Sequence, residues 1–402
     1  MRLIAALLLA AAPAAADPID ATILGLEPAG ESVPLLPIKS LSGYVKELWQ
    51  YSLSPLDRRP YFISLSRARL SADLEAGPFR GRVDYDHVVH AGSYFRTLQH
   101  RQLGLGDPSF WLDMDHTIST SATHDYRHGL HRGWIGIEGE PGFLRFGRQR
   151  VAWGTGRLWN PTDVISPYVP TAVEREERPG ADVVHGRLSV SELTQGEIVW
   201  APEATWPRQA LLARAKSNRA GFDWSLAGGK IAGSTGSWLI GGDIAGDILD
   251  STVYAEWSYS DPRSLRPSWK AVVGLQRGLP PDAKPEFLLK DATIIVEYFH
   301  NGSGASTATR YDPRRLLGGR EIALGKDYVG GSYSRELHPL VKAEVNVIAN
   351  LNDMSHFAGP SLQWNALNNL YLTGGLQRYA GARVTEFGRS PNLGYLQAQF
   401  FF

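Results

Sequence analysis

The sequence predicts an all-β fold, an antiparallel transmembrane β-barrel. Three observations predict it: segments of about ten residues that alternate apolar and polar side chains, aromatic residues near the ends of these segments, and an aromatic closing segment, LGYLQAQFFF. In Val341–Asn350, for example, Val and Ala occupy one face while Lys342, Glu344 and Asn346 occupy the other. One face of such a strand suits lipid and the other suits water.

Alternation alone does not separate a membrane barrel from a soluble β-sandwich, because a sandwich strand also has one buried face. The aromatic residues favour the barrel, since Trp and Tyr gather at membrane interfaces. They recur near segment ends, as at Tyr44, Trp49, Tyr51, Tyr61, Tyr259, Tyr298, Tyr371 and Tyr379. The end of the chain also resembles the closing strand of outer-membrane barrels, and this resemblance implies that Phe400 and Phe402 form the signal read by the barrel-assembly machinery.

The N-terminus predicts export. Residues 1–16, MRLIAALLLAAAPAAA, have the basic start, short apolar run and A-x-A ending of a cleaved signal peptide. Residues 17–40 contain four Pro residues and are expected to form a periplasmic extension. Residues 41–402 are then the barrel, and the expected location is the outer membrane of a Gram-negative cell.

Composition excludes several classes of protein. The chain has no Cys, which excludes disulfides, thiolate metal sites and covalently attached c-type haem. Lys plus Arg equals Asp plus Glu at 41 each, so no net charge draws the chain to nucleic acid. We expect no cofactor and no metal.

Turn residues predict twenty strands, with eighteen as the alternative if the pair at 79–102 is not made of strands. Single-chain bacterial barrels have even strand numbers. The expected strands are 41–51, 61–74, 79–89, 93–102, 109–121, 131–139, 142–151, 182–191, 194–202, 209–217, 221–231, 237–245, 251–260, 268–277, 288–300, 321–334, 338–350, 355–366, 368–380 and 392–402. If the first strand rises from the periplasm, the links at 152–181 and 301–320 lie on the external side.

The link at 152–181 is the candidate functional loop. Its apolar residues, among them Leu158, Val164 and Ile165, favour packing over exposure, so we expect the loop to fold into the lumen and narrow it. Charges that face a pore filter ions. An equally weighted alternative is that the arginines pair with Asp163 or with loop carbonyls and only fix the loop. The candidate constriction residues are Arg145, Arg148, Gln149, Arg150, Trp153, Arg157, Trp159, Asn160 and Asp163, with Gly154, Gly156 and Pro161 shaping the loop.

Two other motifs give weaker indications of function. Gly154–Arg157 looks like a phosphate-binding loop, but the Lys and Ser/Thr that should follow are missing, and we reject that interpretation. His124, His128 and His131 with Asp125 have a spacing that could bind a metal, but solvated histidines on an external turn are the simpler interpretation.

The segment 147–163, GRQRVAWGTGRLWNPTD, resembles a motif of poorly characterised porin-like outer-membrane β-barrels of Gram-negative bacteria. Arg148, Gln149, Trp153, Gly154, Gly156, Asn160, Pro161 and Asp163 carry the resemblance. It implies a barrel with a loop folded at its mouth, and it implies no substrate and no catalytic residue.

We therefore expect a porin, a channel for passive diffusion of small polar or charged solutes. The expected partners are outer-membrane lipid, the assembly machinery, small solutes and, as an option, further copies of the chain. An alternative is a barrel scaffold that sheathes a periplasmic electron carrier or an export complex. An outer-membrane enzyme is a third interpretation, although no Ser/His/acid set stands close together in the sequence.

Overall fold

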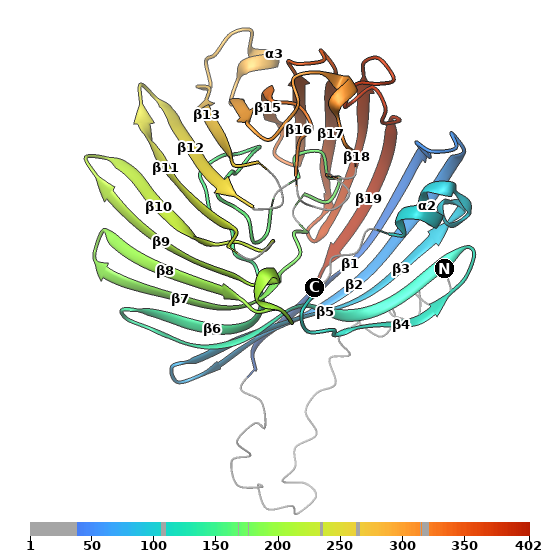
Figure 1. The fold of residues 1–402 in the computed structure, drawn as a ribbon. Coiled ribbons are helices and arrows are strands. Elements are labelled where there is room, and N and C mark those ends of the chain that lie inside the picture. Colours follow the sequence, from blue (N-terminus) through green and yellow to red (C-terminus); the bar gives the residue numbers. More distant parts are fainter. Residues whose placement is uncertain are drawn as a thin grey trace, which may run out of the picture. The chain divides into compact units, whose positions relative to one another are not determined.

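Antiparallel strands close into a ring in a computed structural model that describes residues 38–105, 110–167, 169–175, 177–233, 236–262, 266–313, 315 and 321–402. The expected signal peptide and nearly all of the expected extension lie outside these residues. Within these ranges no helix is long and apolar enough to cross a membrane. Figure 1 shows the strands following one another around the ring in chain order.

The first nine strands are β1 (Ile38–Leu53), β2 (Pro60–Ala76), β3 (Phe79–Gly92), β4 (Asp115–Thr120), β5 (His124–Gly139), β6 (Gly142–Gln149), β7 (Ala181–Ser191), β8 (Thr194–Ala201) and β9 (Ala210–Arg219). The other ten are β10 (Phe222–Lys230), β11 (Trp238–Ile248), β12 (Ser251–Asp261), β13 (Ser268–Gly278), β14 (Thr293–Asn301), β15 (Asp327–His338), β16 (Val341–Asn350), β17 (His356–Leu367), β18 (Leu370–Ala380) and β19 (Leu393–Phe401). Short helices are η2 (Ser93–Arg96), α2 (Leu98–Leu103), η3 (Trp206–Arg208), α3 (Glu286–Leu289) and η4 (Ala308–Arg310).

The ring contains eighteen of these nineteen strands. β3 pairs directly with β5. On the other edge of β5, β6 pairs with residues 133–139 and β4 pairs with residues 125–129, beyond the end of β6. The last strand closes on the first, with Tyr44 opposite Phe401 and Ser52 opposite Leu393. The backbone groups of Phe402 and Gly43 bond to each other at 2.9 and 3.0 Å, so the C-terminal residue takes part in the closure.

The expected count of twenty strands is wrong and the alternative of eighteen is right in number. The expected strand at 93–102 is helical instead, because Gly92 turns the chain at a φ of 144° and the Thr97 side chain accepts a hydrogen bond from the His100 N–H at 3.1 Å. The expected strand at 109–121 is present only as the short β4, which is not one of the eighteen strands that form the ring. The strand at 79–89 is present as β3.

The two ends of the barrel differ in the length of their links. Turns at 77–78, 140–141, 192–193, 220–221, 249–250, 339–340 and 368–369 join strands at one end, which also holds the longer link 279–292. The other end holds long links, including 93–123, 150–180 and 302–326. The expected placement of the links at 152–181 and 301–320 on the same end is therefore confirmed.

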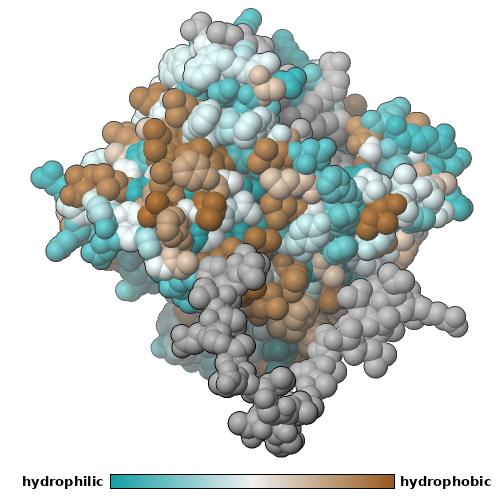
Figure 2. All heavy atoms as spheres, turned by 90° about the horizontal axis from the view of Figure 1, so that it is seen from below, coloured by the Kyte–Doolittle hydropathy of each residue, from teal (hydrophilic) through white to brown (hydrophobic). Residues whose placement is uncertain are grey.

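Side chains alternate between the lumen and the outside along each strand. On β11 to β13 the outward faces carry an aromatic belt near the long-link end, where the ring centroids of Tyr259 lie 5.5 Å from Trp238 and 5.0 Å from Trp269. Seen from below, brown hydrophobic side chains form broad patches on the surface, and teal hydrophilic side chains lie toward its edges (Figure 2).

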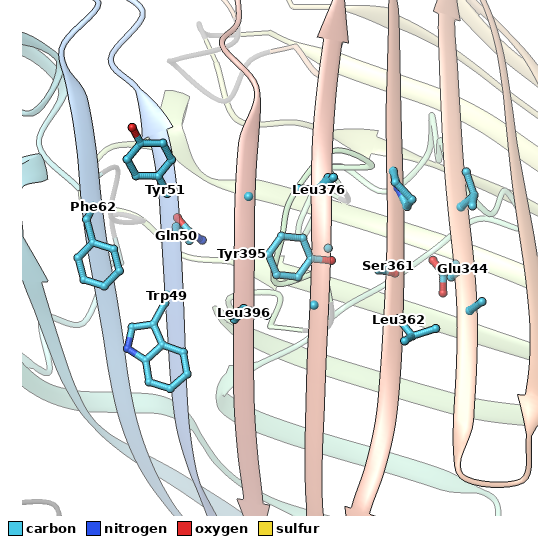
Figure 3. A pocket seen from close by; sticks show the side chains of 16 residues that line it. Trp49, Gln50, Tyr51, Phe62, Glu344, Ser361, Leu362, Leu376, Tyr395 and Leu396 are labelled. Atoms are coloured by element: carbon cyan, nitrogen blue, oxygen red, sulfur yellow. The ribbon is translucent and has the colours of Figure 1, made fainter.

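An apolar groove of about 750 Å³ lies on the outward face at the seam of the ring. Gly374 and Gly394 give it depth, because they place no side chain between larger neighbours. Figure 3 shows Trp49, Tyr51 and Phe62 at one side of the groove and Leu362 and Leu376 at the other. The surface at the seam is therefore apolar, as a lipid-facing surface should be.

Candidate functional site

The link between β6 and β7 runs inside the ring of strands, where Figure 1 draws it in green. Its first half is bound to Glu256 on the inner face of β12, whose side chain is only 1% exposed. One carboxylate oxygen accepts hydrogen bonds from the N–H groups of Thr155 (2.9 Å) and Gly156 (3.3 Å). The other accepts from the N–H (2.7 Å) and the hydroxyl (2.8 Å) of Thr162.

A second buried carboxylate holds the segment between these contacts. Glu297 on β14 is fully buried and accepts from three consecutive N–H groups, those of Arg157, Leu158 (3.0 Å) and Trp159 (3.2 Å). The Tyr254 hydroxyl donates to the same carboxylate at 2.7 Å. Consecutive backbone N–H groups form a natural anion site, and bonds to an ionised acceptor are strong. Here the anion is the Glu297 carboxylate of the barrel wall.

This geometry explains why the segment looked like a phosphate-binding loop. Its glycine-rich backbone does surround an anion, but the place is taken by Glu256 and Glu297. Gly154 has a φ of +96°, and a Cβ there would lie 2.4 Å from a Glu256 oxygen. A Cβ on Gly156 would lie 1.9 Å from the Trp159 carbonyl oxygen. Both positions therefore require glycine.

Aromatic packing completes this attachment. Trp159 is 2% exposed and stacks on Phe299 of β14, with ring centroids 5.2 Å apart. A Cβ on Gly330 of β15 would lie 2.6 Å from the Trp159 ring, so the wall leaves room for the indole. On the other side of the loop Trp153 donates to Glu197 of β8 at 2.9 Å and packs in a cluster with Val151, Val183 and Val199. The wall residues Glu197, Glu256 and Glu297 thus accept this half of the loop.

The second half of the loop binds the opposite wall through its acidic side chains. Glu174 lies 2.5 Å from Lys46 of β1 and 2.9 Å from Arg67 of β2. Glu177 lies 3.0 Å from Arg69 of β2. Burial opposes ionisation of Glu177, but the charges of Lys46, Arg69 and Arg67 outweigh it and hold the pKa of this carboxyl below its usual range. The loop therefore spans the lumen from β12–β14 to β1–β2.

Asp163 lies where the two halves of the loop meet. Its carboxylate accepts from Arg178 at 3.2 Å and from the Ser166 N–H at 3.4 Å. Burial raises the pKa of Asp163 to about 7, against the opposing effect of Arg178. The bond between Asp163 and Arg178 ties the middle of the loop to its end.

The predicted arginines fall into two groups. Arg148 is fully buried, pairs with Asp182 at 2.9 Å, donates to the Leu130 carbonyl at 2.7 Å and lies over the Phe110 ring. Its contacts fix the base of the loop. Arg145 pairs with Glu138 at 2.5 Å on the wall next to β6.

Arg150 and Arg157 form the other group, since both side chains are exposed. Arg157 donates to Gln276 of β13 at 2.9 Å, and its guanidinium lies 5.6 Å from the centre of the Tyr254 ring. Of the four predicted arginines, these two remain accessible beside the loop.

The other predicted residues lie close to the loop anchors. Gln149, Trp153, Trp159 and Asp163 are buried, as is Pro161, while Asn160 is half-buried with its carbonyl accepting from the Asp163 N–H at 3.1 Å. Phe400 and Phe402 are outward and exposed at the seam. Among the described residues no set of three His, Cys, Asp or Glu could hold a metal ion, and this includes His124, His128, His131 and Asp125.

Sequence reasoning missed the wall residues that hold the loop. Glu256 lies on the polar face of the alternating segment Ser251–Ser260, and alternation alone does not distinguish it from other residues that face the lumen. Glu297, Lys46, Arg67 and Arg69 were not singled out. Their signal was weak, because a polar residue at every second position is expected throughout a barrel.

No family model matches the chain, and no curated protein matches it. Several solved structures do. OccAB1 of Acinetobacter baumannii matches with a TM-score of 0.53 at 9% identity, over 93% of this chain and 99% of that one. The outer-membrane protein OpdK of Pseudomonas aeruginosa also matches with a TM-score of 0.53, at 10% identity, over 90% of this chain and 98% of that one. The chain has the fold of an outer-membrane porin. At this identity the likeness concerns the fold alone.

Proposed function

We propose that this protein is an outer-membrane channel through which small polar or charged solutes diffuse passively, with the loop between β6 and β7 as its constriction. The observation that carries the proposal is the attachment of that loop to opposite walls, at Glu256 and Glu297 on one side and at Lys46, Arg67 and Arg69 on the other. A loop held at both walls narrows the lumen.

The charges beside the loop support a modest preference for anions. The loop carboxylates Asp163, Glu174 and Glu177 all have cationic partners. Arg150 and Arg157 are exposed, and the described part of the chain offers neither of them an ion pair within 4 Å. These two arginines therefore add accessible positive charge beside the loop.

The same loop argues against the scaffold alternative. A barrel that sheathes an electron carrier or an export complex needs a free lumen, and here the loop occupies it. The enzyme alternative gains no support from any arrangement of residues described above. We propose export through the signal peptide at 1–16, and recognition of the last strand, with Phe400 and Phe402, by the assembly machinery.

Planar-bilayer recording of the purified protein tests the proposal. We expect stable open-channel steps from the protein alone, and a reversal potential in a KCl gradient that indicates a modest anion preference. A protein that inserts but conducts only when a partner is added would overturn the channel and favour the scaffold.

A further inference from the structure

A polar cavity of about 260 Å³ lies on the inner face of β1, β2 and β3. Lys46 of β1 and Arg67 of β2 both bind Glu174 of the loop, which places every second side chain counted from them on the lumen face. These strands line the cavity with Leu48, Gln50, Tyr61, Ile63, Leu65 and His90. The cavity therefore belongs to the lumen, in contrast to the apolar groove at the seam.

The other side of the cavity comes from the long-link end of the barrel. It consists of η2, α2 and the loop, with the residue after α2, and it contributes Tyr94, Gln99, Leu105 and Glu174. Figure 1 shows α2 near the ends of β1, β2 and β3. The Asp57 side chain accepts the Leu98 N–H at 2.9 Å, and the Ser93 hydroxyl accepts the Phe62 N–H at 3.0 Å. These bonds hold both short helices against β2 and the link before it, so the fold fixes both sides of the cavity.

One polar atom in the lining of this cavity has no hydrogen-bond partner. The Gln99 Oε1 is buried, and no group of the described residues donates to it. A buried carbonyl oxygen without a donor is costly. The Tyr94 hydroxyl donates its own proton to the Gly104 carbonyl at 3.1 Å, so its oxygen can still accept. A solute with O–H groups would supply the donors that these two oxygens accept.

The charges around the cavity favour a neutral solute. Glu174 is the one Asp, Glu, Lys or Arg among the described residues that line it, and this carboxylate already binds Lys46 at 2.5 Å and Arg67 at 2.9 Å. An anion in the cavity would approach the Glu174 carboxylate, and a cation would compete with two cations that the wall supplies. Neither kind of ion gains a free partner there.

The rest of the lining is aromatic and aliphatic. The Tyr61 and Tyr94 rings meet edge to face with centroids 5.0 Å apart, and Leu48 and Ile63 add apolar surface. Such surface with a few placed polar groups is typical of small-molecule sites. Sites for drug-sized ligands enclose roughly 300 to 1,000 Å³, so this cavity suits a smaller molecule. A single sugar ring has this size, with apolar C–H faces and a rim of hydroxyls.

We propose that this cavity binds a neutral, hydroxyl-rich solute of about the size of one sugar ring before the solute passes the loop. Leu48 and Gln50 lie in the part of β1 that leads to the long links, and Glu174 belongs to the loop itself. The cavity thus lies between the long-link end and the constriction. The inference rests on the proposed channel function and names one class of its solutes. A site on a diffusion path must also release its solute, so we expect millimolar affinity.

Planar-bilayer recording with D-glucose as the probe tests the site. We expect glucose to reduce the open-channel current of the natural protein, corrected for bulk conductivity, with saturation at millimolar concentrations. D-Glucuronate, the same ring with a carboxylate, should give no saturable reduction. Gln99→Met removes the amide with little change in length and should raise the half-maximal glucose concentration at least tenfold. Gln363→Met, at an exposed Gln near the other end of the barrel on β17, is the matched control and should keep the natural value.

A second variant makes the test independent of α2. Leu65→Phe fills the cavity from β2 and should abolish the saturable effect of glucose while Gln99 is retained. Folding of each variant is checked by its shift in gel mobility on heating. Equal half-maximal concentrations in the natural protein and in folded Gln99→Met, or a saturable effect of glucuronate as strong as that of glucose, would overturn the proposal.

Saturation-transfer NMR between the detergent-solubilised protein and glucose separates the site from the channel. Transfer to glucose that is lost in Gln99→Met, in a protein that does not conduct, would support the site and overturn the proposed channel function. Conduction of ions without any transfer to glucose would overturn the site and leave the channel in place.

Discussion

At the scale of residues, two buried glutamates decide where the loop lies. Glu256 and Glu297 together accept bonds from six backbone N–H groups, three each, and from the hydroxyls of Thr162 and Tyr254. The loop backbone has no strand partner of its own in this segment. Without these carboxylates its N–H groups would be buried and unsatisfied, which is costly.

We expect Glu256→Ala to weaken attachment of the loop by about 3 kcal/mol, because it removes an acceptor of several charge-assisted bonds. Glu256→Gln, which retains one acceptor oxygen, should have a smaller effect. Hydrogen exchange of the amides at 154–163 measures both. Glu138→Ala removes a wall carboxylate that bonds Arg145 and serves as the control. Unchanged protection in Glu256→Ala would contradict this role.

Asp163 predicts a dependence of loop attachment on pH. Burial raises the pKa of Asp163 to about 7, whereas a detached loop would have a pKa of about 4. The attached state therefore holds a proton that the detached state releases between about pH 4 and pH 7, and attachment weakens as the pH rises through that range. Protection of the loop amides from hydrogen exchange should therefore decrease between about pH 4 and pH 7 in the natural protein, and this decrease should be absent in Asp163→Asn. Identical pH profiles of protection in the two proteins would exclude Asp163 as the origin of the pH dependence.

At the scale of elements, the loop could be found from the sequence but its anchors could not. Two Trp, three Gly and several Arg in one link, among strands with short turns, identified the segment and predicted its inward fold. The anchors lie on β12, β14, β1 and β2. Glu256 and Glu297 are each more than ninety residues away in the sequence from the loop residues Thr162 and Leu158 that they bind. Which polar residue of a strand meets a loop depends on strand tilt and register, and alternation does not reveal these.

The same limit explains the strand that was wrongly expected at 93–102. The segment SYFRTLQHRQ alternates well enough to suggest a strand. Thr97 instead caps a helical turn, and the Asp57 side chain accepts the Leu98 N–H at 2.9 Å. A contact from a different link thus overrides a local pattern.

The packing of Trp159 against β15 predicts that the position of the loop depends on the space left by Gly330. Gly330→Val should displace the indole, since a Cβ alone would lie 2.6 Å from it, and overpacking of this kind costs roughly 1 to 3 kcal/mol. Quenching of Trp fluorescence by iodide should increase as Trp159 becomes accessible. Gly196→Ala, where a Cβ meets nothing within 4 Å, is the matched control. Equal quenching in both variants would mean that Trp159 does not depend on this space.

At the scale of the whole molecule, the sequence predicted a closed barrel with an even number of strands, and the structure confirms it. The alternating segments were sufficient because lipid outside and water inside impose one pattern on every strand. The first count of twenty was too high and the alternative of eighteen was right in number, because segments in long links can alternate without joining the ring.

The accessible arginines predict ion selectivity. We expect the double variant Arg150→Gln, Arg157→Gln to lose most of the anion preference, measured as the reversal potential in a KCl gradient. The preference of the natural protein should also decrease at high salt, because exposed charges are screened. Arg145→Gln removes a guanidinium that is paired with Glu138, and its selectivity should remain that of the natural protein. An unchanged reversal potential in the double variant would mean that other charges set the selectivity.

The most direct test of the central claim is the single-channel conductance of a variant that lacks residues 154–170, compared with the natural protein in the same planar bilayers. This deletion removes the segment bound to Glu256 and Glu297 and leaves the ring of strands intact. A loop that narrows the lumen predicts clearly larger open-channel steps in the variant. Steps of equal size in the two proteins would contradict the account.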